Sequence, residues 1–296
     1  MECMKRSQRY LWLTVVAACA MVIAGCNLLP THQGTQNDRP DKEPIAGAPS
    51  KHALRVSQFI FLSDIEMRRD HLMFKDLANL REQVNRDLHL PPSSTEVFVY
   101  LFENKERYEK FMKAKHPELP ARRAYFVAQP RRLGGTEDLM VYTYWGDRLH
   151  QDLRHELTHA MLHCVLKNVP IWLDEGLAEY FEVPTAQAGV NPQHLDGLRQ
   201  ANAKYDLERL EKLEEVNEMA PAEYRESWAW VHLMLRSTPQ AKQALLGYLQ
   251  ELRTNAKPGP LRPRLAPAFL SLESAVQAHV SELERKLPKN ATAQSR

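Results

Sequence analysis

Two histidines and a glutamate are spaced so that they could hold a metal ion beside a general base. His155, Glu156 and His159 belong to the segment His-Glu-Leu-Thr-His. Residues four apart share one face of a helix, so both imidazoles can point at a single ion. Glu156 cannot face the ion in the same way, but it can reach a water molecule bound there. Zinc with three protein ligands keeps a fourth position for such a water and lowers its pKa to about 7.

A second segment supplies a third ligand. Residues 172–180 read Trp-Leu-Asp-Glu-Gly-Leu-Ala-Glu-Tyr, and Pro170 before them favours the start of a new helix. Glu175 and Glu179 lie one turn apart on this helix. We expect Glu175 to bind the ion and Glu179 to stand behind a histidine as its hydrogen-bond acceptor. A solvated acidic face is the alternative, but the apolar neighbours indicate burial, and buried carboxylates need partners.

Together the two segments resemble the motifs of the gluzincin metallopeptidases, the clan that includes thermolysin and aminopeptidase N. The small size and short spacing look most like its compact "peptidase MA-like" members. The resemblance covers about residues 55–240 and is specific only in the two motifs. It implies that zinc is bound by His155, His159 and Glu175, and that Glu179 supports the first histidine. The connection between the motifs is shorter than in the large members of the clan, so it must be tighter here.

A third segment resembles part of the same clan less closely. Residues 222–231 are similar to the helix of aminopeptidase N in which a tyrosine donates to the tetrahedral oxyanion, which implies that role for Tyr224. A phenol is suited to it, because it donates a neutral hydrogen bond where charge develops. The family's Lys-Gly pair is replaced by Glu226 and Ser227. Tyr224 also begins an apolar stripe at helical spacing that reaches Leu235, so a packing role stays open.

The first residues are typical of an exported lipoprotein. A basic start precedes an apolar stretch over residues 11–24, and Ile-Ala-Gly-Cys ends at Cys26. This pattern describes a signal peptide over residues 1–25, and its apolar run is short for a membrane span. The ending resembles the lipobox of bacterial lipoproteins, which implies that Cys26 carries lipid such as palmitate and anchors the chain to a membrane of the cell envelope. In a host with two membranes the implied location is the outer membrane, facing the periplasm. A plain secretory signal or a membrane anchor is the alternative.

The cysteine and charge content agree with this interpretation. With the signal removed and Cys26 acylated, Cys164 is alone in the mature chain and no internal disulfide forms. We expect His163 and Cys164 to cap or pack rather than to bind the ion. Residues 1–25 hold three of the 39 basic and one of the 37 acidic residues, so 36 of each remain. A net charge near zero gives no indication of nucleic-acid binding.

The remaining chain divides into a tether, one folded domain and a tail. Residues 26–53 are polar with Pro and Gly, which predicts a flexible spacer. Residues 54–287 predict an α+β domain, because strand patterns alternate with helix patterns before helices follow alone. Residues 288–296 form a polar, disordered tail. The gluzincin resemblance implies two lobes, with a mixed sheet and helices first, the active-site helix in the middle and a helical lobe last.

Hydrophobic periodicity predicts the individual elements. Strands are expected over residues 56–62, 97–102, 125–128 and 139–144, and helices over about 70–88, 105–114, 147–166, 193–204, 206–216, 221–236, 239–254 and 267–286, besides the helix that begins after Pro170. By the resemblance, the strand at 139–144 is the sheet edge along the cleft. An extended peptide could add to that edge through main-chain hydrogen bonds.

These features predict zinc-promoted hydrolysis of a peptide bond in a polypeptide substrate, with Glu156 as the general base. Endopeptidase action is preferred, because no segment resembles the strand by which aminopeptidase N holds a free amino group. Two alternatives stay open. The chain could be a catalytically silent zinc-binding lipoprotein that acts as an envelope scaffold or partner-binding module, or a zinc hydrolase that acts on another bond such as a peptidoglycan cross-link. Glu156 favours catalysis, because a purely structural zinc site has no use for it.

Overall fold

The computed structural model describes residues 45–130, 137–201 and 203–287 of the 296-residue chain. The predicted signal peptide, Cys26, most of the predicted tether and the tail over residues 288–296 lie outside these ranges. Within them the fold is α+β, as predicted, with a five-stranded mixed sheet and ten α-helices. No helix of the same ranges is both long and apolar enough to cross a membrane.

The sheet has the spatial order β1-β2-β3-β5-β4. Its strands are β1 (His52–Val56), β2 (Phe59–Ser63), β3 (Val97–Phe102), β4 (Ala124–Pro130) and β5 (Glu137–Tyr144). β2, β3 and β5 run parallel, whereas β1 and β4 pair antiparallel at the two edges. The prediction that residues 139–144 form the edge is therefore wrong, because β5 lies between β3 and β4. Strand order depends on pairing between distant segments, which local periodicity does not encode.

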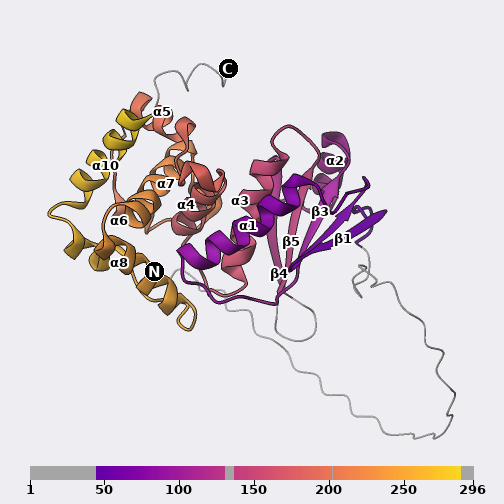
Figure 1. The fold of residues 1–296 in the computed structure, drawn as a ribbon, viewed down its shortest axis with the longest axis horizontal. Coiled ribbons are helices and arrows are strands. Elements are labelled where there is room, and N and C mark those ends of the chain that lie inside the picture. The colour runs from indigo at the N-terminus through magenta and orange to yellow at the C-terminus, as the bar shows by residue number, and fades with distance from the viewer. Residues whose placement is uncertain (1–44, 131–136, 202, 288–296) are drawn as a thin grey trace, which may run out of the picture. The chain divides into compact units, whose positions relative to one another are not determined.

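Helices make up the rest of the described domain (Figure 1). The α-helices are α1 (Leu72–Asp87), α2 (Lys105–Lys115), α3 (Leu149–His163), α4 (Ile171–Phe181), α5 (Pro192–Gln200), α6 (Leu207–Leu210), α7 (Pro221–Arg236), α8 (Pro239–Leu252), α9 (Arg262–Leu265) and α10 (Leu272–Lys286). Short 3-10 helices occur at η1 (Thr185–Gln187), η2 (Val216–Glu218) and η3 (Ala266–Ala268). Proline opens α5, α7 and α8, where its missing N–H is not needed for a helical hydrogen bond.

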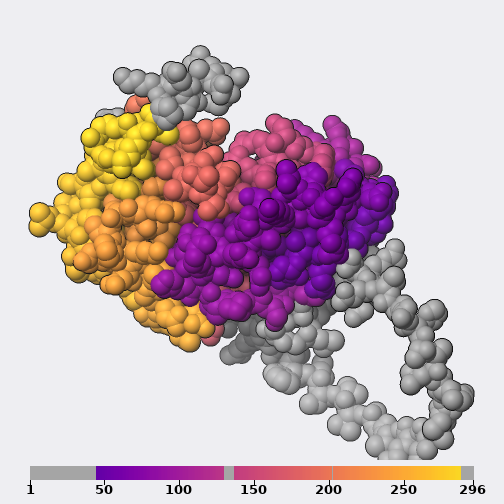
Figure 2. Space-filling model, viewed as in Figure 1, coloured from indigo at the N-terminus to yellow at the C-terminus, as the bar shows by residue number. Residues whose placement is uncertain are grey.

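Both faces of the sheet are covered, so β3 is buried along its whole length. Successive side chains of a strand point to opposite faces. Val99 and Leu101 join a hydrophobic cluster with α1 and α3, whereas Phe98 and Tyr100 pack on the other face with α2. The first cluster continues into α4, α7, α8 and α10, so the sheet and the helices share one core. Figure 2 shows the surface of the sheet-bearing segment and that of the last helices gathered in separate regions of one face.

The element boundaries depart from the predictions at four places. The single strand expected over residues 56–62 is a hairpin, with Ser57 at φ +57° in the turn between β1 and β2. Ordered packing begins before residue 54, because Ala48 is already buried against the second cluster. Only the first turn of the helix expected over 206–216 forms as α6, since the Glu218 carboxylate accepts from the main-chain N–H groups of residues 214 and 215 and so competes with a helix. The last helix begins at Leu272, not at residue 267.

Candidate metal centre

Helix α3 carries the first three residues of the site. Its buried stripe, which includes Leu153 and Leu157, packs against β4, β5, α1 and α4. Because that stripe is buried in the core, His155 and His159 face α4, and Glu156 faces the cavities beside β4. Packing of one apolar face therefore orients the two imidazoles.

Helix α4 brings the third residue to them. It begins after Pro170, and it packs closely on α7 at Gly176. A Cβ atom at this glycine would lie 2.7 Å from the main-chain oxygen of Ser227, which is too close for any other residue. The close approach of the two helices holds the neighbouring Glu175 against the histidines.

Three ligand atoms converge between these helices. The Nε2 atoms of His155 and His159 lie 3.2 Å apart, and Glu175 Oε2 lies 3.5 Å from the first and 3.6 Å from the second. A tetrahedral zinc ion with bonds of about 2.0–2.2 Å places its ligand atoms about 3.3–3.6 Å apart. Glu175 Oε2 is also buried without a hydrogen-bond partner, although a carboxylate oxygen in such a place needs one. The three residues therefore fit a divalent cation of this size.

The carboxylates around His155 and His159 stabilise positive charge on these two side chains. Burial lowers the pKa of His159, but Asp174 and Glu175 outweigh this effect and raise it to about 10. Burial also opposes ionisation of Glu175, yet the two histidines lower its pKa to about 2. The pKa of His155 is raised as well, by Glu175 and Glu182 against the effect of burial. Protons and a metal ion therefore compete for the same imidazole nitrogens, since only a neutral histidine binds metal.

Both opposite ring nitrogens lie close to a carboxylate, but only one of them forms a hydrogen bond. His155 Nδ1 lies 3.1 Å from Glu182 Oε2 and is hydrogen-bonded to it, whereas His159 Nδ1 lies 3.1 Å from Asp174 Oδ2 but is buried without a hydrogen-bond partner. A carboxylate that accepts from Nδ1 keeps the proton there, so that the Nε2 lone pair of His155 would be free to bind a metal ion. The other oxygen of Glu182 accepts from Gln151 at 2.7 Å and from Asn191 at 2.9 Å, which fixes the carboxylate in place.

The prediction for Glu179 differs from this arrangement. Glu179 Oε2 pairs with His194 Nε2 at 2.6 Å, and the acceptor beside His155 is Glu182. The Glu179 carboxylate is held by His194, so the acceptor beside His155 is Glu182, the residue directly after α4.

Glu156 lies beside the metal site, where two cavities meet. One cavity of about 580 Å³ and another of about 480 Å³ share Arg122, His155 and Glu156 in their walls. Burial raises the pKa of Glu156, whereas the neighbouring histidines lower it. A carboxylate with a raised pKa takes up a proton more readily, which suits a general base.

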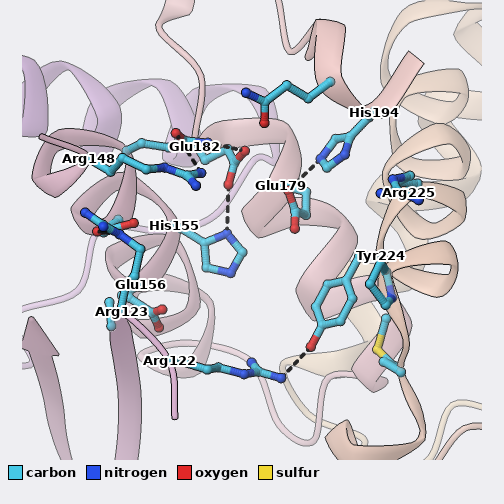
Figure 3. A pocket seen from close by; sticks show the side chains of 16 residues that line it. Arg122, Arg123, Arg148, His155, Glu156, Glu179, Glu182, His194, Tyr224 and Arg225 are labelled. Carbon is cyan, nitrogen blue, oxygen red and sulfur yellow. Dashed lines mark hydrogen bonds and ion pairs between the residues drawn. The ribbon is translucent and has the colours of Figure 1, made fainter. Parts of the chain in front are cut away.

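Tyr224 reaches the larger cavity from α7, on the side opposite Glu156 (Figure 3). Its hydroxyl accepts a hydrogen bond of 2.8 Å from Arg122 Nη2. Burial raises the pKa of Tyr224, so the phenol keeps its proton and can donate it to a ligand in the cavity. The next residue of the predicted stripe, Trp228, is fully buried in the core. Tyr224 is therefore the end of the stripe that faces the cavity.

Several residues of the centre were not expected from the sequence. Asp174 lies within the second motif and Glu182 lies two residues after it, and their acidic side chains were the available signal. Arg122 precedes β4 in a segment without any motif. His163 does not point at the ligand atoms but contacts Asp174 at 3.0 Å, and the Cys164 thiol lies 3.7 Å from the Gln58 amide, in line with packing roles.

Comparison with known proteins does not identify a family. No protein-family model matches the chain, and no curated protein matches its sequence. The function is therefore inferred from the geometry and chemistry of the site.

Proposed function

We propose that this chain is a zinc-dependent peptidase of the gluzincin type that hydrolyses internal peptide bonds of polypeptides in the cell envelope. The observation that carries the proposal is the convergence of His155 Nε2, His159 Nε2 and Glu175 Oε2, with the Glu156 carboxylate beside them in the wall of two open cavities. A structural site closes all its positions with protein ligands, whereas this one opens onto space for a substrate.

The residues divide the chemistry between them. His155, His159 and Glu175 would hold the ion, which when bound supplies a Lewis acid that acidifies water and polarises a carbonyl group. Glu156 accepts the proton of the attacking water and then delivers it to the leaving amine. Tyr224 donates its hydroxyl hydrogen to the carbonyl oxygen as negative charge develops there. Arg122 holds that hydroxyl in place.

The edge strand β4 offers a place for the substrate backbone. Tyr125, Phe126 and Ala128 of this strand line the smaller cavity beside Glu156. An extended peptide that pairs with an exposed sheet edge gains main-chain hydrogen bonds that do not depend on its sequence. The role first expected for residues 139–144 is thus assigned to β4.

The location of the protein is part of the proposal. The lipobox-like ending at Cys26 supports a lipid anchor in the cell envelope, on the periplasmic side of the outer membrane in a host with two membranes. Mass spectrometry of the N-terminal peptide from membrane fractions tests this, and an unmodified Cys26 would reject it.

Zinc content and proteolysis test the enzyme itself. We would compare the purified full-length protein with Glu156→Gln, and use Glu109→Gln on α2 as the matched control. About one zinc per chain in all three, with casein-type cleavage lost only in Glu156→Gln, supports the peptidase. Zinc without cleavage in any of them favours the envelope scaffold instead. A wild-type protein without zinc would reject the metal centre.

A further inference from the structure

The larger cavity beside the candidate metal centre is lined by four arginines and four carboxylates, but only one of these arginines forms an ion pair within the described residues. Four arginines line it, at positions 122, 123, 148 and 225. Arg123 is paired, at 3.1 Å from Asp152 and 3.2 Å from Asp147. Arg122 donates to the neutral hydroxyl of Tyr224, and Arg148 donates to the neutral amide of Gln151 at 3.2 Å. Within the described residues, no carboxylate forms an ion pair with Arg122, Arg148 or Arg225.

Three of the four carboxylates that line the same cavity contact other side chains of the protein. Asp152 pairs with Arg123, and Glu179 pairs with His194. Glu182 accepts from three donors, namely His155, Gln151 and Asn191. Only Glu156 is left, and its role is that of the base. Arg122, Arg148 and Arg225 (Figure 3) therefore line the cavity with guanidinium groups that form no ion pair with a carboxylate of the described residues.

Arg225 lies in the wall of the cavity and packs against the neighbouring helix α5. Its side chain crosses α5 at Gly197, where an added Cβ would lie 2.4 Å from Arg225 Nε. The absence of a side chain at Gly197 gives the guanidinium room beside His194, which lines the same cavity. The charge is thus held by packing against a neighbouring helix.

The smaller cavity differs in character. Leu119, Phe126 and Val216 give it apolar walls, and Glu118 and Glu215 lie in its lining as well. An apolar side chain fits this wall, whereas an anionic group would meet two carboxylates. Because the cavities meet at Glu156, a group on one side of a scissile bond would meet guanidinium groups, and a group on the other side would meet mainly apolar side chains.

We propose that the arginine-lined cavity is a specificity subsite for a substrate carboxylate, and that the preferred substrate has an apolar residue on the other side of the scissile bond. This rests on the proposed peptidase function. The guanidinium group suits the task because its fork of N–H donors matches the two oxygens of a carboxylate. The carboxylate can come from an Asp or Glu side chain or from the C-terminus of a peptide.

Measurements of peptide binding test this proposal independently of catalysis. We would use the zinc-loaded full-length Glu156→Gln protein and measure fluorescence anisotropy with labelled peptides. Blocked peptides with one Glu near a central Phe-Leu pair are compared with the same peptides carrying Gln, and with Gln peptides that end in a free carboxylate. Glu is moved along the peptide position by position, and mass spectrometry locates the cut made by the wild type.

We expect the carboxylate peptides to bind about tenfold more tightly than their Gln counterparts, which is the scale of a charge-assisted hydrogen bond. A preference for Glu identifies a side-chain ligand, and a preference for the free terminus identifies the chain end. Arg225→Glu and Arg148→Glu, each added to Glu156→Gln, should abolish the preference. Gly197→Ala should reduce it, since the methyl group displaces the Arg225 guanidinium without removing its charge.

Arg253→Glu is the matched control, because Arg253 also donates to a glutamine amide three residues away but lies directly after α8, outside the cavity. This variant should keep the preference. Equal binding of Glu, Gln and free-terminus peptides, or a preference that survives both Arg225→Glu and Arg148→Glu, overturns the subsite. Cleavage without any carboxylate preference overturns the subsite alone. Absence of both binding and cleavage overturns the peptidase proposal with it.

Discussion

Replacement of Glu182 by glutamine should weaken zinc binding through the tautomer of His155. In the native protein, the Glu182 carboxylate receives three donors, from His155, Gln151 and Asn191. Glutamine is similar in size but has one accepting oxygen and one donating NH₂ group. One of the three contacts must therefore change.

The two neighbouring amides cannot easily turn over to accommodate the change. The Gln151 oxygen accepts from Arg148, and the Asn191 oxygen accepts from the main-chain N–H of Gln193 at the start of α5. Both amides therefore keep donating toward position 182, and the glutamine oxygen faces them. Its NH₂ group then faces His155 Nδ1, which must become the acceptor. The ring proton moves to Nε2, the nitrogen that should bind zinc.

The expected loss of zinc affinity follows from the role of a carboxylate that accepts a hydrogen bond from a metal-binding histidine. Loss of a carboxylate behind a metal-binding histidine typically weakens metal affinity about 10- to 100-fold, which corresponds to about 1.4–2.7 kcal/mol. Competition with a chromophoric chelator at neutral pH measures the zinc affinity directly. Near-UV circular dichroism confirms that the variant is folded.

Glu179→Gln is the control, because Glu179 is hydrogen-bonded to His194 and, within the described residues, forms no hydrogen bond with His155 or His159. It should change the zinc affinity less than threefold. Wild-type affinity in Glu182→Gln, or an equal loss in Glu179→Gln, would refute the assignment of Glu182 as the acceptor behind His155.

Three further outcomes are expected. Gly176→Ala should lower the free energy of unfolding, measured in urea, by about 1–3 kcal/mol, because the new Cβ atom meets the main-chain oxygen of Ser227. Gly247→Ala on α8 is the control: its Cβ atom meets no other atom, and the change should stabilise the protein by up to about 1 kcal/mol. Equal effects of the two changes would contradict the close approach of α4 and α7. Burial, with His279 and Arg236 nearby, lowers the pKa of His232 from 6.5 to about 3. The unfolded chain therefore binds a proton that the folded chain excludes as the pH falls from 6.5 toward 3, and about 2 kcal/mol of stability should be lost by pH 5. His232→Phe should remove that part of the pH dependence in urea unfolding, and an unchanged slope would count against it. Tyr224→Phe should lower kcat at least tenfold with little change in KM, since its hydrogen bond forms as charge develops; a change in KM alone would instead indicate substrate binding.

Local sequence was sufficient for the elements that carry the ligands. A four-residue spacing on one helix orients His155 and His159 together whatever the rest of the fold does. Pro170 and the apolar pattern after it predicted the start of α4. The apolar neighbours of Glu175 indicated that this carboxylate is buried. The apolar run over residues 97–102 likewise predicted a strand, which is β3. The α+β class followed from the order of these patterns.

The tertiary structure decided which residues surround those ligands. Glu182 rather than Glu179 accepts from His155 because His194 of α5 holds Glu179, and a contact between α4 and α5 is not visible in a linear pattern. The contact between Arg122 and Tyr224 joins segments 102 residues apart. Periodicity describes how one element presents its faces, whereas strand order and the arginine-lined cavity arise from packing between elements. For this reason the sequence indicates the metal centre, and only the folded chain shows what lies around it.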